Sequence, residues 1–148
     1  MTTLDDFAGT AAAAHGLAVT STIRDGTISC SVVSVGVLTH PVTRIPVVGF
    51  VARSDSRKIA NLRRHPRATL AAVAGYRWVA VEGPVNLIGP DDTSDGFDPD
   101  GLAQLLRDVY TAAGGQHPDW RQYDRAMRDE RRAAALLPPN LVYSNPNS

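Results

Sequence analysis

The sequence is poor in several features that would otherwise define a class of protein. Its 148 residues include a single cysteine, Cys30, which excludes a disulfide framework or a multi-cysteine zinc site within the chain. Lysine plus arginine total 15, as do aspartate plus glutamate, so a generalised nucleic-acid or anionic-membrane surface is disfavoured. No apolar run approaches the ~20 residues needed to cross a bilayer, and no signal-peptide pattern is visible. We therefore expect one cytoplasmic domain, residues 1–148, without nucleic-acid or membrane partners.

Motifs that carry chemistry are equally scarce. The histidines match no metal-ligand spacing, and His40, His65 and His117 each precede a proline, so turn positions explain them and we assign no metal. No Walker, Gly-x-Ser-x-Gly or Gly-x-Gly-x-x-Gly pattern is present. Any difficult chemistry would then belong to a bound cofactor, and we assign no catalytic residue.

What the sequence does contain is a series of β-branched segments with helices inserted among them. Asp25-Gly26 predicts a hairpin, and Gly83-Pro84 predicts a bulge or bend within a long strand. Strands are predicted at residues 17–23, 27–37, 45–53, 68–74, 77–88, 132–137 and 140–144, and helices at 4–15, 54–65, 102–113 and 119–131. This order argues against a doubly wound parallel sheet and favours a small antiparallel barrel with helices packed outside it.

The most informative segment runs from Ser54 to Arg67. A β-branched strand leads directly into a short helix, which we expect Ser54 or Asp55 to cap and a His-Pro pair to end. Free backbone N–H groups, the positive end of a helix dipole, and the adjacent cations Arg57 and Lys58 suit a phosphate. A solvated helix face is the alternative interpretation, because charged helix turns are common.

The same segment resembles a known family. Ser56-Arg57-Lys58, then Asn61-Leu62-Arg63-Arg64 and His65-Pro66-Arg67-Ala68, resembles the phosphate-binding helix of the split-barrel flavin- and deazaflavin-binding proteins, which include the pyridoxamine 5′-phosphate oxidase-like group. Residues 78–83 resemble a strand of that family that begins with tryptophan. The C-terminal half, with Asp119-Trp120, Tyr123, Ala126-Met127, Arg131-Arg132, Leu137-Pro138 and Val142-Tyr143, is similar to actinobacterial members that use coenzyme F420. The resemblance covers residues 17–143.

The resemblance implies a mainly β (α+β) fold, namely an antiparallel, FMN-binding-like split β-barrel with a few flanking helices. It also implies a homodimer with two cofactor sites at the subunit interface. The cofactor phosphate is expected on the turn of Ser56, Arg57 and Lys58. The remaining expected contacts are Asn61 with the cofactor's polar chain, Ser31, Val32, Val33, Gly49, Phe50 and Val51 with its ring system, and Trp78 at the pocket border.

The activity that the resemblance implies is the two-electron reduction of a small conjugated or carbonyl-bearing organic acceptor by an F420H2-dependent reductase. An FMN-dependent oxidase or reductase of the same fold is an alternative, because the two cofactors share a ribityl-phosphate portion. A non-catalytic carrier of F420, and a structural domain that binds nothing, are further alternatives. Vitamin B6 oxidation is disfavoured, because the pattern that recognises pyridoxal phosphate is missing near the C-terminus.

Overall fold

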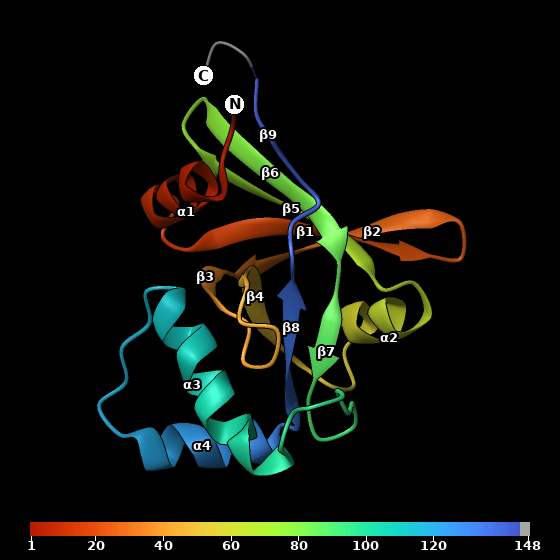
Figure 1. The fold of residues 1–148 in the computed structure, drawn as a ribbon, viewed down its shortest axis with the longest axis vertical. Coiled ribbons are helices and arrows are strands. Elements are labelled where there is room, and N and C mark those ends of the chain that lie inside the picture. Colours follow the sequence, from red (N-terminus) through yellow and green to blue (C-terminus); the bar gives the residue numbers. More distant parts are fainter. Residues whose placement is uncertain (146–148) are drawn as a thin grey trace.

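The structure is a computed structural model that describes residues 1–145. Two antiparallel sheets form its centre, one in the strand order β2-β1-β5-β6-β9 and the other in the order β3-β4-β8-β7 (Figure 1). The strands are β1 (Leu17–Arg24), β2 (Thr27–Ser34), β3 (Gly36–Thr39), β4 (Pro46–Arg53), β5 (Arg67–Ala74), β6 (Arg77–Pro84), β7 (Asn86–Ile88), β8 (Arg132–Leu137) and β9 (Leu141–Tyr143). The helices are α1 (Leu4–Ala13), α2 (Arg57–Arg64), α3 (Leu102–Ala112) and α4 (Trp120–Asp129), with a 3-10 turn, η1 (Pro99–Gly101). The antiparallel, mainly β architecture with flanking helices is confirmed. Within residues 1–145, no helix is long and apolar enough to cross a membrane.

Two strands that the sequence predicts as continuous are divided between the two sheets. Residues 27–37 form β2 and β3, which separate at Val35, and residues 77–88 form β6 and β7, which separate at Val85. At each break the backbone N–H extends the pairing of the first segment by one residue, since Val35 donates to the carbonyl of Gly16 at 2.7 Å and Val85 donates to that of Pro66 at 2.8 Å. The chain then passes to the other sheet. Strands commonly bend where they pass from one packed sheet to another. The continuous strands were therefore wrong, and the bend expected at Gly83-Pro84 falls one residue later.

The hairpin between β1 and β2 confirms the prediction from Asp25-Gly26. These two residues have φ values of 48° and 81°, and they join the paired residues Arg24 and Thr27. A two-residue turn with both central φ angles positive matches the right-handed twist of the flanking strands. The hairpin extends away from the rest of the molecule beside α2 (Figure 1).

Buried apolar side chains form two clusters. The first lies between the sheets and beneath α1 and α2, where Phe7 and Phe50 are almost completely buried. The second packs α3 and α4 against the four-stranded sheet through Leu105 and Val109, among others. Truncating a buried aromatic or leucine side chain to alanine costs about 2–5 kcal/mol. The second cluster therefore fixes the two C-terminal helices on the sheet.

Helix α2 begins later than the sequence predicts. Its N-cap is Ser56, whose Oγ accepts a hydrogen bond from the backbone N–H of Ile59 at 3.4 Å, so the expected caps Ser54 and Asp55 were wrong. The physical reason is that the N–H of Ser54 still donates to the carbonyl of Arg131 at 3.0 Å, which continues the pairing of β4 with β8. The helix ends at His65, as predicted.

Candidate functional site

A cavity of about 440 Å³ lies where β2, β4, the start of α2 and the α3–α4 unit meet. Its volume is within the range of small-molecule binding sites. We call it the α2 cavity. Its lining residues are Val32, Val33 and Ser34 of β2, Val51, Ala52 and Arg53 of β4, Ser56 and Lys58 at α2, Val109, Tyr110 and Ala113 at α3, Tyr123 and Met127 of α4, and Arg132 of β8.

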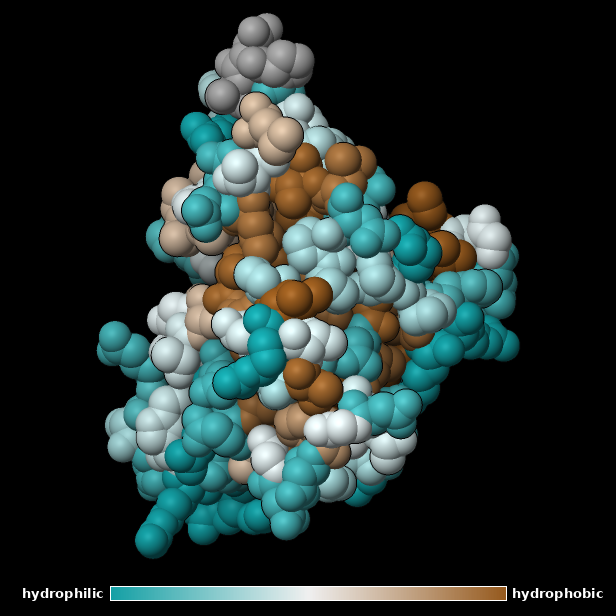
Figure 2. Space-filling model, viewed as in Figure 1, coloured by the Kyte–Doolittle hydropathy of each residue, from teal (hydrophilic) through white to brown (hydrophobic). Residues whose placement is uncertain are grey.

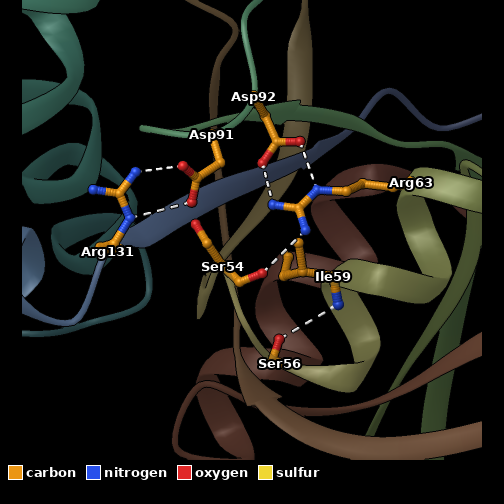
Figure 3. Close-up of polar contacts among 7 residues, drawn as sticks. All are labelled: Ser54, Ser56, Ile59, Arg63, Asp91, Asp92 and Arg131. Atoms are coloured by element: carbon orange, nitrogen blue, oxygen red, sulfur yellow. Dashed lines mark hydrogen bonds and ion pairs between the residues drawn. The ribbon is translucent and has the colours of Figure 1, made fainter.

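The start of α2 brings a helix N-terminus and a cation to this cavity. Ser56 and Lys58 both line it, and Lys58 is the only lysine in the sequence. Figure 3 shows how the Ser56 side chain caps the first turn at Ile59. None of the ion pairs formed by residues 1–145 involves Lys58. A helix N-terminus beside an ammonium group with no acidic partner attracts an anion.

Two arginines that we did not predict as site residues also line the α2 cavity. Arg53 ends β4 and Arg132 begins β8, and the strand register places them directly opposite each other. Each has an acidic neighbour, because Arg53 Nε lies 3.2 Å from Asp55 Oδ1 and Arg132 Nε donates to Glu130 Oε1 at 2.8 Å. Neither acid lines the cavity. Only the pairing of β4 with β8 brings the two arginines together, and no local sequence pattern reports that pairing.

Helices α3 and α4 give the cavity an aromatic wall. The rings of Tyr110 and Tyr123 lie 5.0 Å apart, and both line the cavity together with Met127. The hydroxyl of Tyr123 donates to the carbonyl of Leu106 at 2.9 Å, and burial raises the pKa of Tyr123 to about 12. Tyr123 therefore stays neutral over the whole physiological range. Trp120 supports the wall from behind, with its ring 5.3 Å from that of Tyr123.

The α2 cavity brings together part of the site that the sequence predicts. Val32, Val33, Val51, Ser56 and Lys58 line it. These residues come from two strands and one helix, and they join a strand surface to the candidate phosphate-binding turn. This combination is the one expected for a ring system bound at one end of the site and a phosphate at the other.

The other predicted site residues lie outside the cavity lining. They are Ser31, Gly49, Phe50, Arg57, Asn61 and Trp78. Phe50 is buried in the core, and Asn61 is buried with its Nδ2 donating to Thr22 Oγ1 at 3.1 Å. Trp78 packs edge-on against Tyr143, with the ring centres 6.1 Å apart. Hydrogen bonding and packing within the chain therefore account for the positions of these three side chains.

The chemistry of the lining is limited. Among residues 1–145, those that line the α2 cavity include no carboxylate, imidazole or thiol. The lining can therefore bind an anion, pack against a planar apolar group and donate hydrogen bonds from hydroxyl groups. Lys58, Tyr110 and Tyr123 are the lining side chains that belong to the types used as general acids or bases.

No protein-family model matches the chain. Among solved structures, it is similar to a conserved hypothetical protein of Mycobacterium tuberculosis, with 17% identity, 97% of this chain and 84% of that chain covered, and a TM-score of 0.67. It is also similar to a pyridoxamine 5′-phosphate oxidase-related, FMN-binding protein of Nostoc punctiforme. The two are 14% identical, the match covers 96% of this chain and 84% of that protein, and the TM-score is 0.65. A third similar structure is an F420 reductase. The two are 15% identical, the match covers 86% of this chain and 88% of that protein, and the TM-score is 0.58.

These likenesses define the fold of the chain. Two antiparallel sheets with flanking helices form the FMN-binding split β-barrel of the pyridoxamine 5′-phosphate oxidase-like proteins. Proteins of this fold include both an FMN-binding protein and an F420 reductase.

Proposed function

We propose that this protein binds coenzyme F420 and acts as an F420H2-dependent reductase of a small organic acceptor. The observation that carries the proposal is the α2 cavity, where a capped helix N-terminus and Lys58 share one space with strand surface and an aromatic wall. Phosphate suits the first part and a planar ring system suits the second. The residues present therefore fit a phosphate-bearing flavin or deazaflavin. We also propose a cytoplasmic location, as expected from the sequence.

In this proposal the protein supplies binding and orientation, and the bound cofactor supplies hydride transfer. Ser56 and Lys58 hold the phosphate, and the backbone of β2 and β4 lies against the ring system. Tyr110 and Tyr123 limit the space over the ring and keep bulk water out. The lack of a carboxylate, imidazole or thiol in the described lining supports chemistry that belongs to the cofactor.

Two alternatives have observations in their favour. FMN carries the same ribityl-phosphate portion, and the similar protein of Nostoc punctiforme is FMN-binding, so an FMN-dependent oxidase or reductase is the second candidate. A carrier that binds F420 without turnover is the third, because the described lining offers no carboxylate, imidazole or thiol.

We further propose that the functional unit is a homodimer formed through the five-stranded sheet. Alternation along β1 turns Leu17 and Val19 outward while Ala18 is buried, and Val19 pairs with the exposed Val32 of β2. Val73 of β5 is also exposed. Hydrophobic side chains gather over this sheet on the face seen in Figure 2. A second copy would remove this apolar surface from water.

Hydride transfer is the direct test of the proposed activity. The protein is mixed anaerobically with a stoichiometric amount of reduced F420, and oxidation of the cofactor is followed by absorbance as conjugated and carbonyl-bearing acceptors are added. Oxidation that depends on both protein and acceptor supports the reductase. Tight binding of F420 with no oxidation by any acceptor supports the carrier. Turnover with FMN alone supports the second candidate.

A further inference from the structure

The side chain of Arg63 spans two parts of the chain that meet behind the phosphate-binding turn. It projects from α2 toward the loop after β7, where its Nε donates to Asp92 Oδ1 at 2.9 Å and its Nη2 donates to Asp92 Oδ2 at 2.8 Å (Figure 3). Its Nη1 donates to the backbone carbonyl of Ser54 at 3.2 Å. The guanidinium therefore donates to two groups at once, through Nε and Nη2 to a carboxylate and through Nη1 to the segment that leads into α2.

Ser54 is fixed from its other side as well. Its N–H donates to the carbonyl of Arg131 at 3.0 Å, and the Arg131 side chain forms an ion pair with Asp91. The Arg131 guanidinium lowers the pKa of Asp91 by hydrogen bonding, so that carboxylate stays ionised. The Ser54 carbonyl thus accepts from the side chain of Arg63, which Figure 3 shows, and the Ser54 N–H donates to the backbone of Arg131. Each of these arginines pairs with one of two adjacent aspartates.

The loop that carries these aspartates is itself held in place. Gly89 and Asp92 exchange two backbone hydrogen bonds, of 2.9 and 3.2 Å. The Asp92 side chain is only 12% exposed, against 36% for Arg63. The carboxylate therefore provides a partly buried and rigidly placed anchor for the guanidinium.

We propose that Arg63 is a positioning residue that sets the geometry of the anion-binding turn at Ser54–Lys58 without contacting the ligand. This inference rests on the proposed function. Neither Arg63 nor Asp92 lines the α2 cavity. The affinity of an anion site depends on how well its donors are ordered before the ligand arrives. Fixing the Ser54 carbonyl orders the residues that lead into the cap at Ser56, and the cap in turn orders the first N–H groups of α2.

The experiment compares wild-type protein with Arg63→Gln, Arg63→Lys and Asp92→Asn. Arg64→Gln is the matched control, because Arg64 is the next residue on α2 and its pair with Asp25 is exposed on both sides. Binding of FMN and of riboflavin is measured for each protein, since riboflavin has the same ring system and lacks the phosphate. Hydrogen exchange of the Ser54 and Ser56 amides is measured without ligand.

We expect both Arg63 variants and Asp92→Asn to weaken FMN binding by about tenfold while riboflavin binding stays the same. Arg63→Lys should fail like Arg63→Gln, because lysine keeps the charge and loses the planar fork. Exchange at Ser54 and Ser56 should be about tenfold faster in these variants and unchanged in Arg64→Gln.

An equal loss of FMN and riboflavin binding, or wild-type behaviour in Arg63→Lys, would overturn the proposal, because either result points to general stability or simple charge. Unchanged exchange at the turn would also overturn it. If wild-type protein binds neither flavin nor F420, the proposed function fails by itself. Amide exchange at the turn then still decides whether Arg63 orders it.

Discussion

Arg53 and Arg132 lie directly opposite each other on neighbouring strands, and both line the α2 cavity. Like charges at opposed positions of an antiparallel pair destabilise a sheet. Their acidic partners, Asp55 and Glu130, offset this repulsion, and neither of them is among the cavity-lining residues. The two arginines give the cavity a basic wall, whose charge a bound anion would neutralise.

The first prediction concerns Arg53→Gln. The free energy of unfolding without ligand should change by no more than about 0.5 kcal/mol, because the Arg53–Asp55 pair is exposed and exposed pairs contribute little. Binding of FMN or F420 should nevertheless weaken. Denaturant unfolding and a cofactor titration on the same variant check both parts. Arg121→Gln, an exposed position on α4 outside the cavity lining, is the control and should change neither quantity.

The second prediction separates the two cations that the sequence singles out. Lys58→Ala should weaken cofactor binding by about tenfold, because it removes a charge-assisted bond to phosphate from inside the cavity. Arg57→Ala should have a much smaller effect, since Arg57 is exposed and does not line the cavity. Fluorescence titrations of the two single variants distinguish them. A larger loss of affinity in Arg57→Ala than in Lys58→Ala would indicate that the phosphate binds on the outer side of the helix turn.

The third prediction is a loss of stability in alkali that Tyr123 causes. In the folded protein the pKa of Tyr123 is raised from its ordinary value of 10.0 to about 12, chiefly because the side chain is buried. Below pH 10 the Tyr123 hydroxyl keeps its proton in both the folded and the unfolded protein, so the stabilisation is fully present. Between pH 10 and about 12 only the unfolded state releases it, so the free energy of unfolding falls by up to about 1.4 kcal/mol per pH unit.

Tyr123→Phe should remove this part of the pH slope. It should also lower stability at neutral pH by about 1 kcal/mol, because the hydrogen bond to the carbonyl of Leu106 is lost. Denaturant unfolding between pH 7 and pH 12 measures both effects. Tyr76→Phe, at a fully exposed tyrosine, should leave the profile unchanged. An unaltered slope in Tyr123→Phe would contradict the assignment.

The fourth prediction tests the dimer face. Val73→Arg places a charge on the outer surface of the five-stranded sheet, where burial against a second copy would leave it unpaired. We expect this variant to be monomeric by sedimentation velocity at concentrations where the wild type is dimeric. Ile45→Arg, at an exposed apolar residue outside that sheet, should stay dimeric. A dimeric Val73→Arg variant would place the interface elsewhere.

The sequence predicts those parts of the fold that local chemistry decides. Asp25-Gly26 specifies a turn, and His65-Pro66 ends a helix, because each acts through the backbone of its own residues. The break at Val35 was missed, and the bend near Val85 was placed one residue early within a continuous strand, because apolar alternation continues through both positions. Their positions depend on where two sheets must separate, which is a property of the whole barrel.

The same distinction between local and long-range effects applies to the candidate site. Lys58 could be singled out because it sits in a helix turn whose neighbours in sequence are its neighbours in space. Arg132, Tyr110 and Met127 could not, because strand pairing and helix packing bring them to the cavity from distant parts of the chain. Arg63 belongs with these residues, since its partner Asp92 lies on a loop whose path the sequence does not predict.

The central claim is that the α2 cavity binds a phosphate-bearing flavin-type cofactor, with F420 as its ligand. The most direct measurement is a side-by-side fluorescence titration of purified apo-protein with F420 and FMN, repeated on Lys58→Ala. We predict micromolar or tighter binding of F420, weaker binding of FMN, and a clear loss of affinity in the variant. Tighter binding of FMN would contradict the assignment of F420. If neither cofactor binds, the claim itself is contradicted and only the fold remains.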